Sequence, residues 1–354
     1  MMIPTLTLLA AAVQPLAVQQ EVRIQFAPDS GVSLDKVVSS RHSLISQGFR
    51  RTIGSESEII PLPIKLESSQ RVVVSDQYVA SRGGRPVTLR RYYKGGNVES
   101  KLGSTVDENL PVSVVDLPSQ IKDASVVFTW VPEEEAYGRY YDGAELPERW
   151  LPGLAFDMDA LELLPAEPVP IGGSWKVEAG ELRGLFSTFA GQRYEEAPRG
   201  TDRMLLRTLG AGIGANLHQV VSGECTGGAE LTLEKVDAGL ATIQISINRI
   251  SVINDLTDYM QGEDLRREKE AGVDAQAGRM ALDFSGRGTM VWNLEAGHLQ
   301  ELKIALQENA TMGAKMAVEN QEEEIWDELI LAGTLILSIE CEPGSLPEAP
   351  GPRR

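Results

Sequence analysis

The chain has 354 residues, of which 42% are hydrophobic and 24% are charged, an ordinary balance that excludes disorder along its whole length. Its 51 acidic and 33 basic residues give a formal net charge of -18, and such a surface repels nucleic-acid phosphates and anionic lipid headgroups alike. We therefore expect no nucleic-acid partner, and the length allows two domains.

The N-terminal segment is predicted to direct export. Residues 3–13 are almost wholly apolar, a run too short to span a bilayer but of the right length for a signal-peptide core. Small residues at 10–12 suit cleavage, although no Lys or Arg precedes the core. We predict a signal peptide at residues 1–17 and a location in the bacterial periplasm, envelope or extracellular space. A buried first strand or a wrongly assigned start is the alternative. No later apolar run is long enough for a transmembrane span.

The first predicted hairpin lies between residues 72 and 89, where apolar residues alternate on both sides of the turn at residues 82–85. A Gly-Gly pair between two alternating runs is typical of a tight hairpin turn. We interpret the basic residues around it as a solvated hairpin surface, with a docking patch for an acidic partner as the alternative. These residues are Arg82, Arg85, Arg90, Arg91 and Lys94.

The middle of the chain combines one further strand with short helices. Val126–Trp130 alternates as a strand does, and Asp157 is placed to cap a short helix that ends before Pro165. Apolar residues recur at helical spacing over Glu178–Ala190. Three prolines in Leu164–Gly173 favour a boundary between an N-terminal β-rich region, 18–164, and a C-terminal β-rich region, 165–342.

The C-terminal region reads as a series of antiparallel strands. Isoleucines alternate with polar residues over Leu240–Asn248, after a turn at Asp237-Ala238-Gly239, and a similar turn at Glu295-Ala296-Gly297 joins two more alternating runs. Apolar residues occupy both parities of Ile325–Ile339, which predicts a central strand covered on both faces. Residues 343–354 are rich in Pro and Gly and are expected to be disordered. The fold class is therefore mainly β, with antiparallel hairpins forming curved sheets or half-barrels and a few short helices.

No motif assigns a catalytic residue, a metal site or a cofactor. Gly210–Ala215 nearly matches a dinucleotide-binding fingerprint, but no helix of the required length follows it, so we interpret it as a loop. His42, His218 and His298 are isolated and form no paired metal-binding motif. We predict no metal and no cofactor.

Two cysteines occur, Cys225 and Cys341, each beside a strand-like run. Export would permit a disulfide between them if they faced each other across a sheet. Two buried thiols explain the same sequence equally well.

A curved sheet with an apolar face can close over a ligand. Residues in or beside the C-terminal strands are the candidates for such a lining, and a filled core with Met occupying gaps is the competing interpretation. The candidate lining residues are Met290, Trp292, Ile304, Met312 and Met316.

Acidic residues leave a hydrolase open as an alternative. A glycosidase needs two carboxyl groups facing one bond beside aromatic platforms. The candidate carboxyl groups are Asp157 with Asp159, Glu133–Glu135 and Glu322–Glu324, with Trp130, Trp150, Trp175 and the tyrosines as possible platforms. Aromatic residues that serve only as core and hairpin anchors are the competing interpretation.

Three segments, Val126–Trp130, Val169–Trp175 and Met290–Leu299, together resemble a loose group of uncharacterised, acidic, β-rich bacterial exported proteins of unknown function. In that group a Gly-x-x-Trp segment follows a Pro-rich stretch, and a Trp-containing strand enters an acidic-x-Gly turn. The resemblance implies localisation and fold class, and it brings no catalytic residues.

The function expected from the sequence is an exported, non-enzymatic β-scaffold that binds an apolar small molecule, a lipid or an envelope protein. The alternatives are an acidic-cleft hydrolase and a structural or interaction protein with a filled core.

Overall fold

A computed structural model gives the arrangement of most of the chain. The expected signal peptide at 1–17, the glycine segment at 210–215, His218 and most of the expected tail at 343–354 lie outside the residues it describes. The described residues are 21–106, 113–143, 146–186, 189, 192, 194, 223–255, 273–318 and 324–346.

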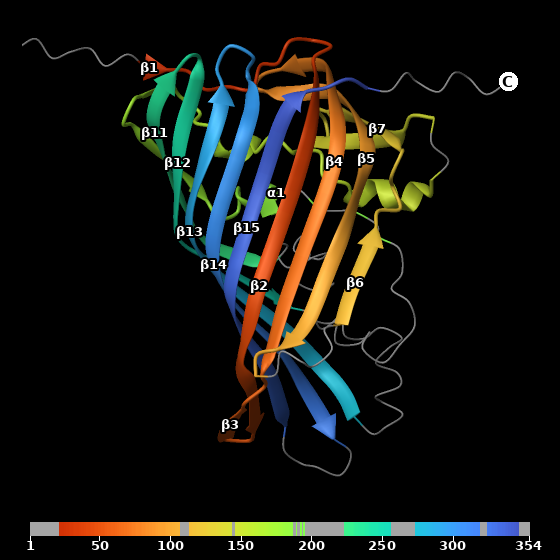
Figure 1. Ribbon diagram of the computed structural model, residues 1–354, viewed down its shortest axis with the longest axis vertical. Coiled ribbons are helices and arrows are strands. Elements are labelled where there is room, and N and C mark those ends of the chain that lie inside the picture. Colours follow the sequence, from red (N-terminus) through yellow and green to blue (C-terminus); the bar gives the residue numbers. More distant parts are fainter. Residues whose placement is uncertain are drawn as a thin grey trace, which may run out of the picture.

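One antiparallel sheet of thirteen strands dominates the molecule (Figure 1). Its order is β10-β11-β12-β13-β14-β15-β2-β4-β5-β7-β8, while β3 pairs with the end of β2 and β6 pairs with β5. A separate pair joins β1 (Glu21–Val22) to β9 (Val169–Pro170). The strands of the large sheet are β2 (Ser33–Ile53), β3 (Glu56–Ile60), β4 (Ile64–Arg82), β5 (Arg85–Ser104), β6 (Ser113–Pro118), β7 (Ser125–Val131), β8 (Ala136–Tyr141), β10 (Ser174–Glu178), β11 (Glu224–Asp237), β12 (Leu240–Asp255), β13 (Val273–Asn293), β14 (His298–Val318) and β15 (Ile325–Pro343).

Alternation along the strands gives the sheet one buried face, called the inner face here. In β12, Ile243, Ile245 and Ile247 are at most 2% exposed, while Gln244 between them is exposed. Because successive side chains of a strand point to opposite faces, this period of two assigns each apolar residue to the inner face. The predicted mainly β, antiparallel fold with few short helices is confirmed.

The expected hairpin turns form, for the expected reason. Gly83 and Gly84 join β4 to β5 with φ of 61° and 76°, and Ala238 and Gly239 join β11 to β12 with φ of 47° and 78°. Positive φ at both central residues matches the twist of the flanking strands.

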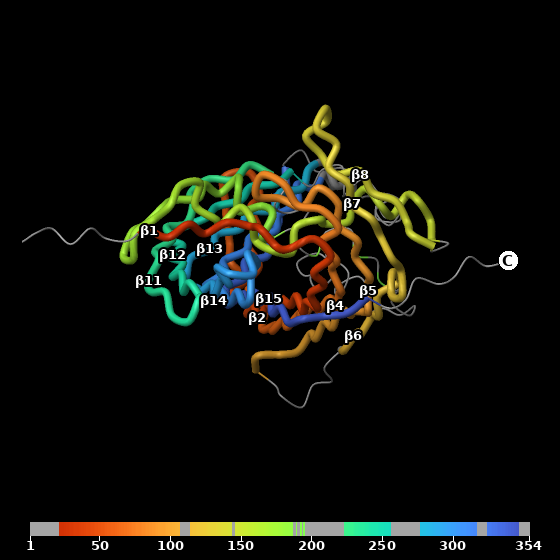
Figure 2. The backbone as a smooth tube through the Cα atoms, turned by 90° about the horizontal axis from the view of Figure 1, so that it is seen from above, coloured from red at the N-terminus to blue at the C-terminus, as the bar shows by residue number. Residues whose placement is uncertain are grey.

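A crossing segment, residues 146–186, covers the inner face. Seen from above, the strands form an arc, and the chain from yellow to green runs along its open side (Figure 2). This segment contains η1 (Glu148–Gly153), η2 (Leu161–Leu163), β9, β10 and α1 (Arg183–Phe186).

The two expected helices are much shorter than the sequence suggests. Among the described residues of these two stretches, only Leu161–Leu163 and Arg183–Phe186 are helical. The N-cap of the first is Ala160 and not Asp157 as expected. The Asp157 carboxylate nevertheless accepts hydrogen bonds from the backbone N–H groups of Asp159 and of Leu161, the first residue of η2, at 2.7 and 3.0 Å.

Strand β15 lies at the centre of the sheet, between β14 and β2, as its apolar run predicts. The expectation that both of its faces are covered is wrong, since Ile336 on the outer face is 48% exposed. Because β15 pairs with β2 along its length, strands from both sides of the boundary expected at 164 share one sheet.

The turn between β13 and β14 holds the N-terminal chain against the sheet. Gly297 has φ of 67°, its carbonyl accepts a hydrogen bond from Ala27 N at 2.8 Å, and a Cβ here would lie 2.6 Å from the Ala27 backbone. We predict that Gly297→Ala lowers the free energy of unfolding by roughly 2–4 kcal/mol, through backbone strain plus this clash.

Gly83→Ala is the matched control, because Gly83 has a similar φ of 61° but no atom within 4 Å of the added Cβ. It should cost only about 1–2 kcal/mol, from the left-handed backbone alone. Denaturant unfolding of both variants measures the difference, and equal losses would show that the contact with Ala27 does not form.

Candidate functional site

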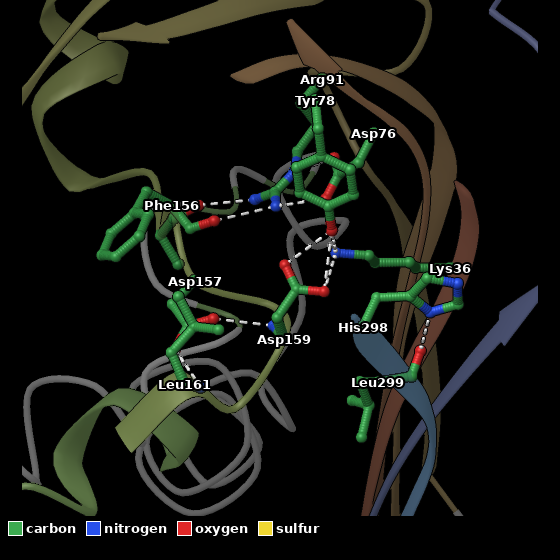
Figure 3. A network of polar contacts seen from close by, with 11 residues as sticks. Lys36, Asp76, Tyr78, Arg91, Phe156, Asp157, Asp159, Leu161, His298 and Leu299 are labelled. Atoms are coloured by element: carbon green, nitrogen blue, oxygen red, sulfur yellow. Dashed lines mark hydrogen bonds and ion pairs between the residues drawn. The ribbon is translucent and has the colours of Figure 1, made fainter. Parts of the chain in front are cut away.

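The upper part of the inner face holds a fully buried network of charged side chains (Figure 3). Lys36 comes from β2, Asp76 and Tyr78 from β4, Arg91 from β5, and Asp159 from the crossing segment. All five are at most 1% exposed. We call this set the ion network.

Lys36 lies at the centre of the ion network. Its Nζ is 2.8 Å from Asp76 Oδ2, 2.8 Å from Asp159 Oδ1 and 2.7 Å from the hydroxyl of Tyr78. The Tyr78 hydroxyl in turn donates to the Asp159 carboxylate at 2.8 Å. Each of the three donors of Lys36 thus has a partner.

Arg91 connects the sheet to the crossing segment. Its guanidinium binds Asp76 in a bidentate pair at 2.6 and 2.8 Å and donates to the carbonyls of Ala155 and Phe156 at 2.7 and 2.9 Å. The basic residues near the first hairpin therefore do not form one solvated surface, which corrects the expectation for Arg91. A buried guanidinium needs an anionic partner, and Asp76 on the neighbouring strand supplies it.

Burial and charge pairing act in opposite directions on the pKa values of the ion network. Burial alone would lower the pKa of Lys36, but Asp159 and Asp76 outweigh it and raise that pKa. Burial would raise the pKa of Asp76, but Arg91 and Lys36 outweigh it and lower it. For Asp159, burial wins over Lys36, and the pKa is raised.

The ion network can fasten the crossing segment but offers no group for catalysis. Its two cations and two carboxylates bond to one another, and the Asp157 carboxylate accepts from the backbone N–H groups of Asp159 and Leu161. Asp157 and Asp159, suggested for a hydrolase, therefore do not face one open space together. Trp175, one of the suggested platforms, donates from its Nε1 to Leu163 O at 2.9 Å and packs against the core.

Further down the inner face, a second set of polar residues crosses four strands. These residues are 0–6% exposed, and we call them the polar belt. His42 Nδ1 is hydrogen-bonded to Glu308 Oε2 at 2.8 Å, and Ser68 Oγ to Ser100 Oγ at 3.2 Å. The polar belt consists of Ser40 and His42 on β2, Ser68 and Gln70 on β4, Ser100 on β5 and Glu308 on β14.

Below the polar belt some apolar side chains of the inner face are more exposed, although the buried Asp327 of β15, paired with Arg51, lies among them. Met312 and Met316 of β14 are half-buried, and Leu329 and Ile325 pair with them on β15. Phe49 pairs with Leu329 from β2. We call these five apolar residues the lower apolar surface.

The five residues predicted to line a ligand fall into two groups. Met290, Trp292 and Ile304 are at most 1% exposed in the upper core. Met312 and Met316 lie together on the lower apolar surface. The sequence pattern alone does not separate these groups, because the alternation along each strand places the side chains of both groups on the inner face.

The disulfide considered for Cys225 and Cys341 does not form. Cys225 lies on β11 and Cys341 on β15, with β12, β13 and β14 between them. The register aligns Cys225 with Leu331 of β15, ten residues from Cys341. The two cysteines are therefore four strands apart and roughly 33 Å apart along the strand direction, whereas a disulfide needs Cα atoms within about 7 Å. Burial raises the pKa of the Cys341 thiol to about 12, so it is uncharged at neutral pH.

In the part of the chain that the structure describes, no three His, Cys, Asp or Glu side chains gather to hold a metal ion. No helix among these residues is both long and apolar enough to cross a membrane.

Sequence reasoning missed the ion network and the polar belt. A usable signal was present, since Lys36 and His42 occupy the same parity of β2 as the buried Leu34, Val38 and Leu44. A polar residue at an inward position of an alternating strand requires a buried partner.

No family model matches the chain, and no curated protein matches it. The similar solved structures include an outer membrane channel from Pseudomonas putida F1, with 8% identity, a TM-score of 0.25, and coverage of 93% of this chain and 100% of that one. The outer membrane protein OprG from Pseudomonas aeruginosa has 5% identity and a TM-score of 0.17, over 88% of this chain and 98% of that one. Such low TM-scores carry no argument about this chain, and the resemblance to exported β-rich proteins stays a prediction.

We predict that Lys36→Met lowers the free energy of unfolding by about 3–5 kcal/mol, because Asp159 is left buried without a cation. The double variant Lys36→Met/Asp159→Asn should recover part of this loss. Lys303→Met, which breaks an exposed pair with Glu301, is the control and should change little. Denaturant unfolding measures all three, and a Lys36→Met protein as stable as wild type would contradict the role of the ion network.

Glu162 of η2 gives a pH-dependent prediction. Burial, with Asp157 nearby, raises its pKa from 4.5 to about 10, so the folded state keeps a proton that the unfolded state has lost above pH 4.5. Stability from this group is complete at low pH and declines as pH rises toward 10, by at most about 1.4 kcal/mol per unit.

Glu162→Gln removes this titration, so the variant should gain stability over wild type as pH rises from 5.5 to 8.5. Denaturant unfolding at both pH values measures the gain. A difference between the two proteins that is independent of pH would show that Glu162 is not held protonated by the fold.

Proposed function

We propose that this chain is an exported, non-enzymatic β-scaffold protein that binds an apolar chain, such as a lipid acyl chain, at the lower apolar surface. The crossing segment, fastened by the ion network, covers the upper inner face. The ligand lies below it, where inward-facing apolar side chains are less covered.

A change of exposure along β14 carries this proposal. The inward residues Leu302, Ile304, Leu306 and Ala310 are at most 1% exposed, whereas Met312 and Met316 on the same side are half-buried. The upper part of this row is filled core, and apolar side chains that stay partly uncovered mark a place for another apolar molecule.

The residue types at the lower apolar surface suit a flexible ligand. Methionine is unbranched and polarizable, so it adapts to chains of different shape. On the neighbouring strand β15, Ile325 and Leu329 continue this surface but are only 8% and 9% exposed, whereas Ile53 of β2, which pairs with Ile325, is 36% exposed.

Export is supported by the apolar run at residues 3–13, followed by small residues. A non-enzymatic role is supported by the ion network, whose charged groups are occupied with one another. A carrier or scaffold needs no reactive group at its binding surface.

One observation favours a hydrolase as the second candidate. His42 Nδ1 is hydrogen-bonded to Glu308, and Ser68 lies directly opposite His42 on β4. The imidazole therefore lies between a serine and an acid, as in a Ser-His-acid triad. However, Ser68 Oγ is hydrogen-bonded to Ser100 rather than to His42. Binding is therefore the better-supported function.

We predict that wild-type protein binds an apolar fluorescent probe or oleate, and that Met312→Glu weakens this binding at least about tenfold by placing a charge among apolar groups. Thr311→Glu is the matched control, since residue 311 immediately precedes Met312 on β14 and its side chain faces the outer side of the sheet. Titration of both variants, with circular dichroism to verify folding, measures the effect.

Equal loss in both variants, or none in either, would count against the lower apolar surface as the binding site. If Met312→Glu does not fold, Met316→Glu makes the same comparison nearer the end of the strand.

A further inference from the structure

One ion pair interrupts the lower part of the inner face. Asp327 occupies an inward position of β15 and pairs in register with Arg51 of β2. The Arg51 guanidinium donates to the Asp327 carboxylate from Nε to Oδ1 at 2.9 Å and from Nη2 to Oδ2 at 3.0 Å. Apolar side chains in place of a buried ion pair often leave a protein equally stable. Stability alone therefore does not account for charges at this position.

Apolar side chains lie above and below this ion pair on the inner face. The inward positions of β2, β15 and β14 form rows in the register of the sheet, and the row of the ion pair continues to the small side chain of Ala314 on β14. The neighbouring rows are Phe49, Leu329 and Met312 above, and Ile53, Ile325 and Met316 below. The ion pair thus lies within the surface proposed to hold an acyl chain.

The two partners differ in exposure. The side chain of Asp327 is 6% exposed, whereas that of Arg51 is 40% exposed. The guanidinium of Arg51 also lies 5.7 Å from the centroid of the Phe49 ring. A carboxylate on one edge and an aromatic ring beside it favour one orientation of a guanidinium. Asp327 therefore positions Arg51, and Arg51 carries the exposed part of the pair.

The exposed edge of Arg51 specifies the chemistry of an occupant. A guanidinium has five N–H donors and no acceptor. Asp327 takes one N–H of Nε and one of Nη2, which leaves the edge formed by Nη1 and Nη2 for another partner. Whatever meets this edge must accept hydrogen bonds, and the two oxygens of a carboxylate match two parallel N–H groups.

The other charges near Arg51 do not occupy this edge. Glu58 of β3 pairs in register with Arg51, but its side chain is exposed and lies beyond ion-pair distance. Solvent and salt screen such an exposed charge. Arg50 and Glu328, the next residues along the same strands, pair with each other at 3.1 Å on the outer face. A carboxylate at the free edge would contact the guanidinium directly, with Asp327 on the far side.

We propose that Arg51 binds the carboxylate of the ligand, so that the ligand class is a long-chain fatty acid, and that Asp327 is a positioning residue for Arg51. This inference rests on the proposed function and deepens it. The carboxylate lies at the free edge of Arg51, and the acyl chain contacts Met312 and Met316 on β14.

Three probes with the same chain and different heads test the charge preference: oleate, methyl oleate and oleylamine. Full-length wild-type protein should bind oleate about tenfold or more tightly than methyl oleate, because only oleate makes two charge-assisted hydrogen bonds with Arg51. Oleylamine, whose head only donates, should bind no more tightly than methyl oleate. Competition against an apolar fluorescent probe measures all three affinities.

The double variant Arg51→Leu/Asp327→Leu removes both charges and so leaves no buried carboxylate without a cation. Its affinity for oleate should fall to that for methyl oleate, which should stay within about twofold of wild type. Arg50→Leu/Glu328→Leu is the matched control, because it removes an ion pair from adjacent positions of the same strands on the outer face. The control should keep the preference for oleate.

If the double variant does not fold, Arg51→Lys keeps a cation beside Asp327 but removes the planar edge. The preference for oleate over methyl oleate should then fall severalfold. An unchanged preference in this variant would contradict a contact made by two parallel N–H groups.

The remaining outcomes separate this inference from the proposed function. Equal wild-type affinity for oleate and methyl oleate, or an oleate preference that survives in the double variant, would overturn the role of Arg51 while the proposed function stands. Tightest binding of oleylamine would overturn it too, since Asp327 and Glu58 would then set the charge preference. Binding of none of the probes would contradict the proposed function itself.

Discussion

The ion pair between Lys36 and Asp159 is the interaction on which the rest of the arrangement depends. Lys36 belongs to β2 in the middle of the sheet, and Asp159 belongs to the crossing segment, so their contact at 2.8 Å joins two layers that are far apart in sequence. Arg91 adds a second connection through the carbonyls of Ala155 and Phe156. A buried charge without its partner is strongly destabilising, so these contacts fix one position of the crossing segment rather than many.

Because these contacts hold the crossing segment over the upper strands, the inner face has a covered upper zone and a less covered lower zone. Above, the crossing segment and the strands share a filled core around residues such as Met290 and Trp292. Below, Met312 and Met316 stay half-buried, and the polar belt lies between the two zones. A sheet that is closed at one end and less covered at the other suits a ligand with an apolar chain.

Local patterns predicted the fold well and the polar sites poorly. The period of two in 240–248 and the glycines at 83–84 determine strands and turns because both effects act within a few residues. Arg91 was expected in solvent since its neighbours in sequence are basic, yet its partner Asp76 lies on the adjacent strand. The contact of His42 with Glu308 requires the register of three strands, which no local pattern contains. Whether Cys225 and Cys341 meet depends in the same way on strand order, and three strands lie between theirs.

Native mass spectrometry of the protein purified from the cells that produce it tests the central claim most directly. The account predicts one apolar molecule per chain, retained under native conditions, released on denaturation and identified after solvent extraction as a molecule with an acyl chain. A chain that carries no such molecule, and that takes up none of the oleoyl probes when they are added, would contradict the claim that its inner face is a binding surface.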